Sequence, residues 1–211
     1  MARKHSIKKF SKIPLHGLIL AGGKSTRMKK DKSLLEYHGK KQVVYCFDLL
    51  SQFCDQVFIS NRKDQSRLAA HKKLPQIHDV FVGIGPLGGI LSALTRYPEV
   101  AWLVLACDLP FVDESAIKIL IKKRDFSRTA TAYRSAHEPN LPEPLCAIYE
   151  PKALVQLLQF LAQGIQCPRV ILLRCDTRLI AQRPGISLDN VNNPQEYRKV
   201  LSVIRRNPAD K

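Results

Sequence analysis

The sequence predicts an α/β protein in which a mostly parallel sheet is covered by helices on both faces. Short apolar runs alternate with amphipathic stretches of helical spacing along nearly all of the 211 residues, a pattern typical of strand–helix–strand units. In addition, 45% of the residues are hydrophobic, so a chain of this length can bury a substantial core. We therefore expect a globular protein, with ligands bound where the strands end.

Five apolar runs have the length and composition of strands. They are rich in β-branched and aliphatic residues and are bounded by polar residues, glycine or proline. They cover residues 15–20, 55–60, 101–106, 129–133 and 144–149. The longest apolar run, residues 100–107, is far shorter than the roughly 20 residues that a membrane helix needs. The sequence therefore predicts no membrane span, and we expect no membrane partner.

Five amphipathic stretches are predicted to be helices. Proline or an acidic residue opens several of them, as is common at helix N-termini. They cover residues 42–53, 86–97, 113–124, 151–164 and a final stretch that starts at Pro194. These stretches separate the predicted strands and supply the helices that cover the sheet.

The domain organisation is predicted to be simple, with a loose basic arm at residues 1–14 and a single domain at residues 15–211. The arm carries five Lys and Arg residues within its first twelve. The apolar run that follows breaks at Ala21, Gly22 and Gly23, so it lacks the long hydrophobic region of a secretory signal. The six cysteines show no CxxC motif and no Cys-His ligand spacing, which favours buried, reduced thiols. We therefore expect a cytoplasmic protein.

The formal net charge of +16 predicts attraction of anionic partners. Charge alone leaves nucleic acid, a nucleotide, a phosphorylated metabolite and an anionic membrane as possibilities. The chain has one Trp, no recognisable RNA- or DNA-binding motif and no interleaving of aromatic with basic residues. We therefore expect no nucleic-acid partner.

The stretch GLILAGGKSTRMKKDKSLL, residues 17–35, places a glycine turn directly after the first predicted strand. Five basic side chains and Asp31 follow within residues 24–32. Gly22 and Gly23 would let backbone N–H groups approach phosphate oxygens, which the cations would neutralise. The spacing matches neither GxGxxG nor GxxxxGK[ST]. Taken alone, the stretch is also compatible with an ordinary glycine turn followed by a solvated basic loop.

Asp108 follows the predicted strand at residues 101–106, within the sequence Cys-Asp-Leu-Pro. A carboxylate there is costly to bury unless it is paired or binds a metal. Mg²⁺ typically takes one or two carboxylates together with substrate phosphates and water. The alternative is an aspartate that caps a turn.

Two further motifs can each be interpreted either as part of a binding site or as a purely structural feature. GIGPLGGI, residues 83–90, could present helix N-terminal N–H groups to an anion or form a tight helix–strand junction. In LDNVNNPQEY, residues 188–197, Asn190 and Asn192 are two positions apart. They would share one side of an extended segment and could contact a substrate or metal. Alternatively, Asn192 or Asn193 caps the last helix.

The order of these motifs resembles that of the molybdenum cofactor guanylyltransferases, the MobA-like nucleotidyltransferases. The elements are LAGG followed by R-M-x-x-D-K, then GPLGG, CDLP and NVNNP, spread over most of the chain. The resemblance implies a three-layer α/β/α sandwich with a mostly parallel, Rossmann-like sheet of the nucleotide-diphospho-sugar transferase type. It also implies transfer of GMP from Mg-GTP to the molybdenum-molybdopterin cofactor with release of pyrophosphate. Other molybdenum cofactor biosynthesis proteins and molybdoenzyme chaperones are the partners it suggests.

The resemblance also assigns site residues. Those implied to bind nucleotide are Leu20, Ala21, Gly22, Gly23, Lys32, Asn61, Asp79 and Asp108. Arg27 and Lys32 are implied to act on the triphosphate and Asp108 to hold Mg²⁺, which makes these three the catalytic candidates. Asn190 and Asn192 are implied on the acceptor side, together with PEPLCAIY at residues 142–149.

Two departures from the family pattern leave alternatives open. Lys29 stands where the family usually has glycine, and Asn193 replaces the usual threonine. A lysine with φ > 0 costs on the order of 1 kcal/mol. A degenerate paralogue that binds nucleotide without transferring it therefore remains an alternative. A CTP-dependent cytidylyltransferase and a sugar-phosphate nucleotidyltransferase are the others.

Overall fold

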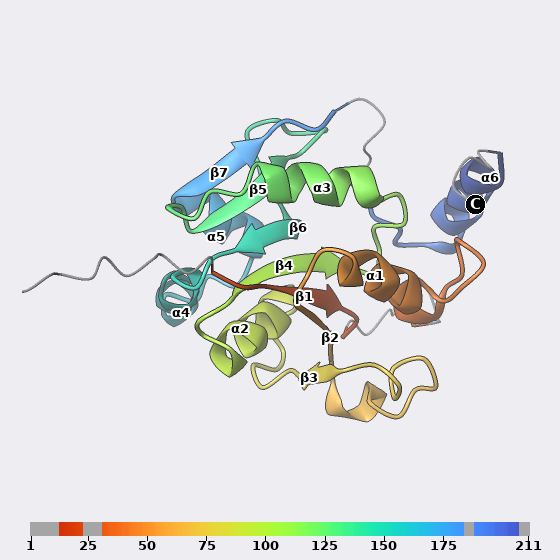
Figure 1. Cartoon of the computed structure of the whole chain (residues 1–211), viewed down its shortest axis with the longest axis horizontal. Helices are drawn as coiled ribbons and strands as arrows, with labels where there is room; N and C mark the ends of the chain where they lie inside the picture. The colour runs from red at the N-terminus through yellow and green to blue at the C-terminus, as the bar shows by residue number, and fades with distance from the viewer. Residues whose placement is uncertain (1–12, 23–30, 184–187, 207–211) are drawn as a thin grey trace, which may run out of the picture.

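The computed structural model describes residues 13–22, 31–183 and 188–206, whose strands form one seven-stranded sheet (Figure 1). The strand order is β3-β2-β1-β4-β6-β5-β7. The strands are β1 (Leu15–Leu20), β2 (Gln56–Asn61), β3 (Gln76–His78), β4 (Ala101–Ala106), β5 (Ala130–Arg134), β6 (Pro142–Tyr149) and β7 (Thr177–Ile180). All five strands expected from the sequence are present, and β3 and β7 are additional.

The sheet is mostly parallel, as predicted, and β6 is the exception. β1 pairs in parallel with β2 and β4, β2 pairs in parallel with β3, and β5 with β7. β6 runs antiparallel to both β4 and β5. The reason is the short connection between β5 and β6, closed by the N–H of Ser135 donating to the carbonyl of Leu141 at 2.8 Å. A connection this short cannot make the crossover that parallel neighbours require.

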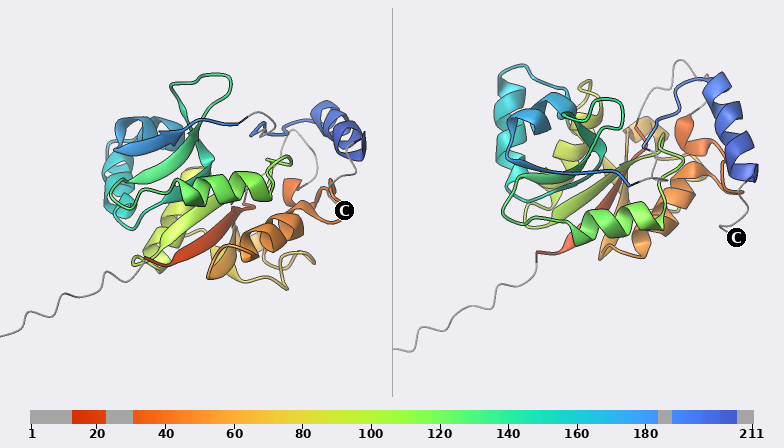
Figure 2. Two further views of the ribbon diagram at one scale, coloured as in Figure 1. Left: turned by 45° about the horizontal axis from the view of Figure 1, so that its top comes forward. Right: turned by 90° about the horizontal axis from the view of Figure 1, so that it is seen from above.

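Helices cover both faces of the sheet and produce the predicted three layers (Figures 1 and 2). The helices are α1 (Gln42–Ser51), α2 (Pro86–Arg96), α3 (Glu114–Lys122), α4 (Ala153–Ala162), α5 (Pro168–Arg174) and α6 (Pro194–Arg206). Buried residues of α1 and α3 share one core cluster with the sheet, whereas those of α2, α4 and α5 share a second. Every residue of β4 is buried, because this central strand lies between the two clusters.

The last helix, α6, stands beside the sheet rather than on either face (Figure 2). Its Val200 packs with Leu35, Tyr37 and Val191 in a separate small cluster. The hydroxyl of Tyr197 also donates to the carbonyl of Glu36 at 3.1 Å. This packing brings the C-terminal segment against the segment that follows the basic cluster.

The remaining sequence expectations are met only in part. All six cysteines are free thiols, but Cys167 is exposed and Cys54 and Cys175 are only partly buried, which corrects the expectation that the cysteines are buried. Residues 1–12 of the expected arm lie outside the described residues. Pro14 already joins the sheet, because its carbonyl accepts the N–H of Ala101 at 2.9 Å. Within the described ranges, no helix is long and apolar enough to cross a membrane.

Candidate active site

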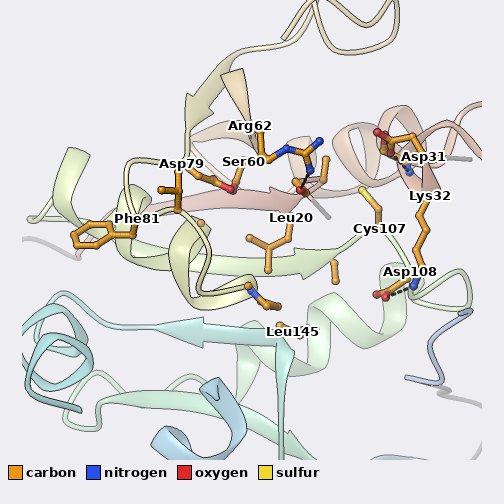
Figure 3. Close-up of a pocket in the computed structure, with 18 of the residues that line it drawn as sticks. Leu20, Asp31, Lys32, Ser60, Arg62, Asp79, Phe81, Cys107, Asp108 and Leu145 are labelled. Carbon is orange, nitrogen blue, oxygen red and sulfur yellow. Dashed lines mark hydrogen bonds and ion pairs between the residues drawn. The ribbon is translucent and has the colours of Figure 1, made fainter. Parts of the chain in front are cut away.

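A cleft of about 610 Å³ opens where β1, β2 and β4 end (Figure 3). Residues from seven separate segments line it, including Leu20, Ala21, Gly22, Asp31, Lys32, Ser60, Arg62, Asp79, Phe81, Gly85, Cys107, Asp108, Leu145 and Asn192. The carboxyl ends of parallel strands meet at one edge of a sheet, which explains why residues so distant in sequence converge. In Figure 3, Asp79 and Ser60 lie toward one end of the cleft and Lys32 and Asp108 toward the other.

Lys32 and Asp108 form the first polar group of the cleft. The ammonium of Lys32 lies 3.1 Å from Asp108 Oδ2 and donates to Asn192 Oδ1 at 2.8 Å. Asn192 is held nearby because the N–H of its neighbour Val191 donates to the carbonyl of Asp108 at 2.8 Å. Three segments that are far apart in sequence are therefore joined at one lysine.

The second oxygen of Asp108 fits a metal ligand. Asp108 Oδ1 is buried and has no hydrogen-bond partner among the described residues, a costly state for a carboxylate oxygen. No group of three or more His, Cys, Asp or Glu side chains in the described ranges could hold a metal. A cation here would therefore take most of its ligands from substrate phosphates and water, as Mg²⁺ commonly does.

Asp79 and Ser60 form the second polar group. The Ser60 hydroxyl donates to Asp79 Oδ1 at 2.6 Å, and burial raises the pKa of the Asp79 carboxyl. The backbone around the carboxyl is tight, since a Cβ on Gly22 would lie 2.9 Å from Asp79 Oδ2. Gly22 thus lets the nucleotide loop implied by the sequence pass directly beside this carboxylate.

The motif GIGPLGGI forms the tight junction that the sequence offered as one alternative, and it also places the N-terminus of α2 at the cleft. Gly83 (φ 82°) and Gly85 (φ 61°) adopt the positive φ that favours glycine, and both line the cleft at the N-terminus of α2. Gly88 and Gly89 instead make a tight junction. A Cβ would lie 2.1 Å from the Phe81 carbonyl oxygen at Gly88 and 2.2 Å from Ser60 Oγ at Gly89.

Arg62 is a cleft residue that is not among the site residues implied by the resemblance. Its Nη1 donates to the carbonyl of Gly22 at 2.7 Å, and its guanidinium also pairs with Asp64. The hydrogen bond to Asp64 raises the pKa of Arg62 further. Its position directly after β2 was the available signal, because residues that follow parallel strands converge at this edge.

The structure brings together most of the predicted site residues that it describes. Leu20, Ala21, Gly22, Lys32, Asp79, Asp108 and Asn192 all line the cleft. Gly23 and Arg27 lie outside the described residues, as does Lys29. Asn190 is exposed and does not line the cleft. Of the described residues 188–193, Asn192 alone lines it, whereas Val191 packs in the small cluster with Val200. Asn193 caps α6, accepting the N–H groups of Gln195 and Glu196 at 3.0 and 2.9 Å.

Asn61 is placed differently from the expectation of a nucleotide contact. Its side chain is fully buried and points away from the cleft lining. It hydrogen-bonds to His71, Gln76 and His78. The neighbouring residues Ser60 and Arg62 line the cleft instead, because side chains alternate between the two faces at the end of a strand.

Comparison with known proteins agrees with the fold and with the family that the sequence resembles. Residues 17–181 match the MobA-like NTP transferase domain, and the chain therefore belongs to this family of nucleotidyltransferases. A Synechocystis protein named molybdenum cofactor biosynthesis bifunctional protein is 39% identical over 190 residues. The match covers 90% of this chain but 54% of that protein, so the chain spans about half the length of this relative.

Two other relatives match along nearly their whole length. A probable molybdenum cofactor guanylyltransferase from Nostoc is 28% identical over 195 residues, covering 90% of each protein. The crystal structure of molybdopterin-guanine dinucleotide biosynthesis protein A from Archaeoglobus fulgidus superposes with a TM-score of 0.75 at 24% identity. That superposition covers 90% of this chain and 99% of the other. The predicted fold type is thereby confirmed.

Proposed function

We propose that this chain transfers GMP from Mg-bound GTP to the molybdenum cofactor and releases pyrophosphate. The observation that carries the proposal is the placement of Asp108, with one oxygen beside the Lys32 ammonium and the other buried without a partner. This is an arrangement suited to a metal-bound triphosphate. The choice of GTP and of the molybdenum cofactor is supported by relatives named molybdenum cofactor guanylyltransferases.

The residues of the cleft supply what nucleotidyl transfer needs. A phosphate oxygen of the acceptor forms a bond to the α-phosphorus of GTP, the bond from that phosphorus to the bridging oxygen breaks, and pyrophosphate leaves. The reaction mainly requires in-line positioning and neutralisation of phosphate charge. Lys32 supplies a cation, and the turn at Ala21 and Gly22 lets backbone approach the phosphates. Asp108 would hold Mg²⁺, which supplies further charge neutralisation when it is bound.

We place the acceptor on the opposite side of the cleft from Asp79. Leu145 of β6 and Asn192 both line the cleft, Asn192 beside Lys32, and both belong to segments that the sequence assigned to the acceptor. Asn192 is already oriented by its hydrogen bond to Lys32, so it is the stronger acceptor candidate and Asn190 the weaker. Other molybdenum cofactor biosynthesis proteins and molybdoenzyme chaperones are the partners that this role would involve, with a cytoplasmic place of action.

The first test is nucleotide selectivity, read from thermal unfolding with Mg²⁺ and GTP, CTP, ATP or UTP. A ligand that binds only the folded state at about 100 times its Kd adds roughly 2.7 kcal/mol. We expect selective stabilisation by Mg-GTP that is weakened in Asp108→Ala, followed by pyrophosphate release when molybdenum cofactor is added. Selective stabilisation by Mg-CTP would move the assignment to cytidylyl transfer. Binding without turnover would indicate a degenerate paralogue.

A further inference from the structure

His71 is a buried histidine that the proposed chemistry does not use. It lies between the 3₁₀-helix η2 (Lys63–Gln65) and β3, and it is fully buried. Both of its ring nitrogens contact side chains. Nε2 lies 2.8 Å from Ser33 Oγ and Nδ1 lies 3.2 Å from Asn61 Nδ2. Ser33 lines the cleft, next to Lys32. His71, which does not line the cleft, therefore contacts the site through the Ser33 hydroxyl.

Backbone carbonyls fix the orientation of the two side-chain amides beside this histidine. Gln76 Nε2 donates to the carbonyls of Ser66 at 3.4 Å and His71 at 3.1 Å, so Gln76 Oε1 must be the acceptor for Asn61 Nδ2 at 2.9 Å. Asn61 Nδ2 is therefore also the donor to His71 Nδ1. A neutral ring that accepts at Nδ1 carries its proton on Nε2, which donates to Ser33 Oγ.

The chain of hydrogen bonds that starts at His71 continues through Ser33 to Asp31. The Ser33 hydroxyl, having accepted from His71, donates to Asp31 Oδ1 at 2.6 Å, and the Ser33 N–H donates to the same oxygen at 3.0 Å. Gln65 Nε2 donates to Asp31 Oδ2 at 2.8 Å. Asp31 is the N-cap of the 3₁₀-helix η1 (Lys32–Leu34). Asp31 Oδ2 is therefore held by Gln65 from outside η1, and Asp31 Oδ1 is held by Ser33, whose hydroxyl contacts His71.

We propose that His71 is a positioning residue for Lys32. Acting through Ser33 and Asp31, its Nε2–H fixes η1 at the place from which the Lys32 ammonium reaches Asp108 and Asn192. A lysine has a long, flexible stem, so its ammonium is held in place only if the backbone that carries it is fixed. The role of Lys32 in this inference rests on the proposed function.

The protonation state of His71 agrees with this role. Burial lowers the pKa of the His71 imidazole, so the ring is neutral at neutral pH. A protonated ring would direct an N–H from Nδ1 at the N–H of Asn61, whose amide cannot turn over. The Asn61 amide is fixed because Asn61 Oδ1 accepts from His78 Nδ1 at 3.0 Å while Asn61 Nδ2 donates to Gln76. The orientation of the Asn61 amide therefore favours the tautomer that carries its proton on Nε2.

A pair of amide variants at position 71 separates positioning from mere packing. In His71→Gln, the side-chain N–H reaches about as far as the ring Nε2 and can still donate to Ser33. In His71→Asn, the shorter amide reaches only the place of Nδ1 and leaves Ser33 without its donor. Ser33→Ala removes the same link from the other side. Ser66→Ala is the matched control, because the Ser66 hydroxyl bonds only locally to the carbonyl of Lys63.

The measurements are kcat and KM for Mg-GTP with molybdenum cofactor in excess, together with the melting temperature of each variant. We expect kcat to fall about 10-fold in Ser33→Ala and His71→Asn, as when an outer-shell hydrogen bond is lost. We expect His71→Gln and Ser66→Ala to stay close to wild type. Wild-type kcat in Ser33→Ala, or an equal loss in His71→Gln and His71→Asn, would overturn the proposal.

Failure of the proposed function would look different. A wild-type chain that binds Mg-GTP but transfers no GMP contradicts that function and leaves the positioning testable by binding. In that case we expect Ser33→Ala to bind Mg-GTP more weakly than Ser66→Ala by isothermal titration. Equal dissociation constants in these two folded variants would then overturn the role of His71.

Discussion

Asp108 and Asp79 line the same cleft, but their surroundings prepare them for different tasks. Asp108 has the Lys32 ammonium at 3.1 Å and an oxygen without a partner in the described ranges, so it is ready to receive a cation. Asp79 has a hydroxyl donor in Ser60, and burial outweighs the more distant Arg62 and His78 in raising the pKa of its carboxyl. Such a group gains most from ligand N–H or O–H donors. Two aspartates at one sheet edge thus differ through their neighbours rather than through their own chemistry.

The strongest test of this contrast is Asp108→Asn. The amide keeps the shape of the side chain but cannot supply a charged oxygen to Mg²⁺. We therefore expect kcat to fall on the order of 1000-fold, the upper range for loss of one electrostatic contact to a transition state. Pyrophosphate release at saturating Mg-GTP measures the effect.

The matched control is Asp113→Asn, at an aspartate that caps α3 by accepting the N–H of Ala116 at 2.8 Å. Asparagine caps helices about as well as aspartate, so this variant should keep both stability and activity. An Asp108→Asn enzyme with near wild-type kcat would mean that the two aspartates do not differ in the way described.

Lys32→Gln tests the cationic partner of Asp108. Loss of the ammonium removes positive charge next to the triphosphate and also the donor to Asn192. We expect kcat to fall on the order of 100-fold, the lower range for such a contact, with a raised KM for Mg-GTP. Lys40→Gln removes a lysine of an exposed pair with Asp48 and is the control. Equal, small losses in both variants would show that only general positive charge matters.

Gly89→Ala perturbs the Asp79 side and leaves the Asp108 side intact. The new methyl group would meet Ser60 Oγ at 2.2 Å and Leu20 Cδ2 at 2.9 Å, so β1, β2 and α2 must move apart. We expect a loss of about 1–3 kcal/mol in the free energy of unfolding, as for other overpacked sites. Urea unfolding measures it.

Ser60→Ala, combined with Gly89→Ala, tests whether the loss of stability arises from the contact between the new methyl group and Ser60 Oγ. It removes the closest contact of the new methyl group, and we expect it to restore part of the stability lost in Gly89→Ala. If Gly89→Ala alone were as stable as wild type, the close approach of α2 to β2 would not constrain this side of the cleft.

Whether a strand or helix could be predicted from the sequence depends on the length of its apolar or amphipathic run. Long apolar or amphipathic runs, such as residues 101–106, gave β4 (Ala101–Ala106) with its bounds unchanged. β3 (Gln76–His78) has three residues and α5 (Pro168–Arg174) has seven. Elements this short have too few positions to show a period, and their existence depends on pairing with β2 and packing on β6. The antiparallel direction of β6 follows from a loop, which periodicity does not reveal.

The site shows the same division between local and tertiary information. Residues that directly follow strands, such as Asp108 and Gly22, were predicted because parallel strands end at one edge. The burial of Asn61 and the presence of Ser60 and Arg62 in the cleft lining depend on which way each side chain points where β2 ends. The partners of His71 are up to 38 residues away in sequence, so no local pattern identifies this histidine.

Asp79→Asn is expected to have the smallest effect of these substitutions, and it tests the raised pKa of the Asp79 carboxyl. The amide keeps an acceptor for the Ser60 hydroxyl and removes a half-buried charge. We therefore expect the free variant to melt slightly higher than wild type at neutral pH, with a smaller thermal shift from Mg-GTP. A carboxyl whose pKa is higher in the folded than in the unfolded state binds more protons when folded, so wild-type stability rises as pH falls through that pKa.

The stability advantage of Asp79→Asn should accordingly shrink as the pH is lowered and change no further below about pH 4, the ordinary carboxyl pKa. Asp125→Asn is a control of opposite sign. Hydrogen bonds from Ser127 lower the pKa of the Asp125 carboxyl, so this variant should be no more stable than wild type at neutral pH. Thermal melts of the three proteins from pH 4 to 8 make the comparison. An Asp79→Asn advantage that is absent, or independent of pH, would mean that Asp79 carries no burial penalty and does not differ from Asp108 in the way described.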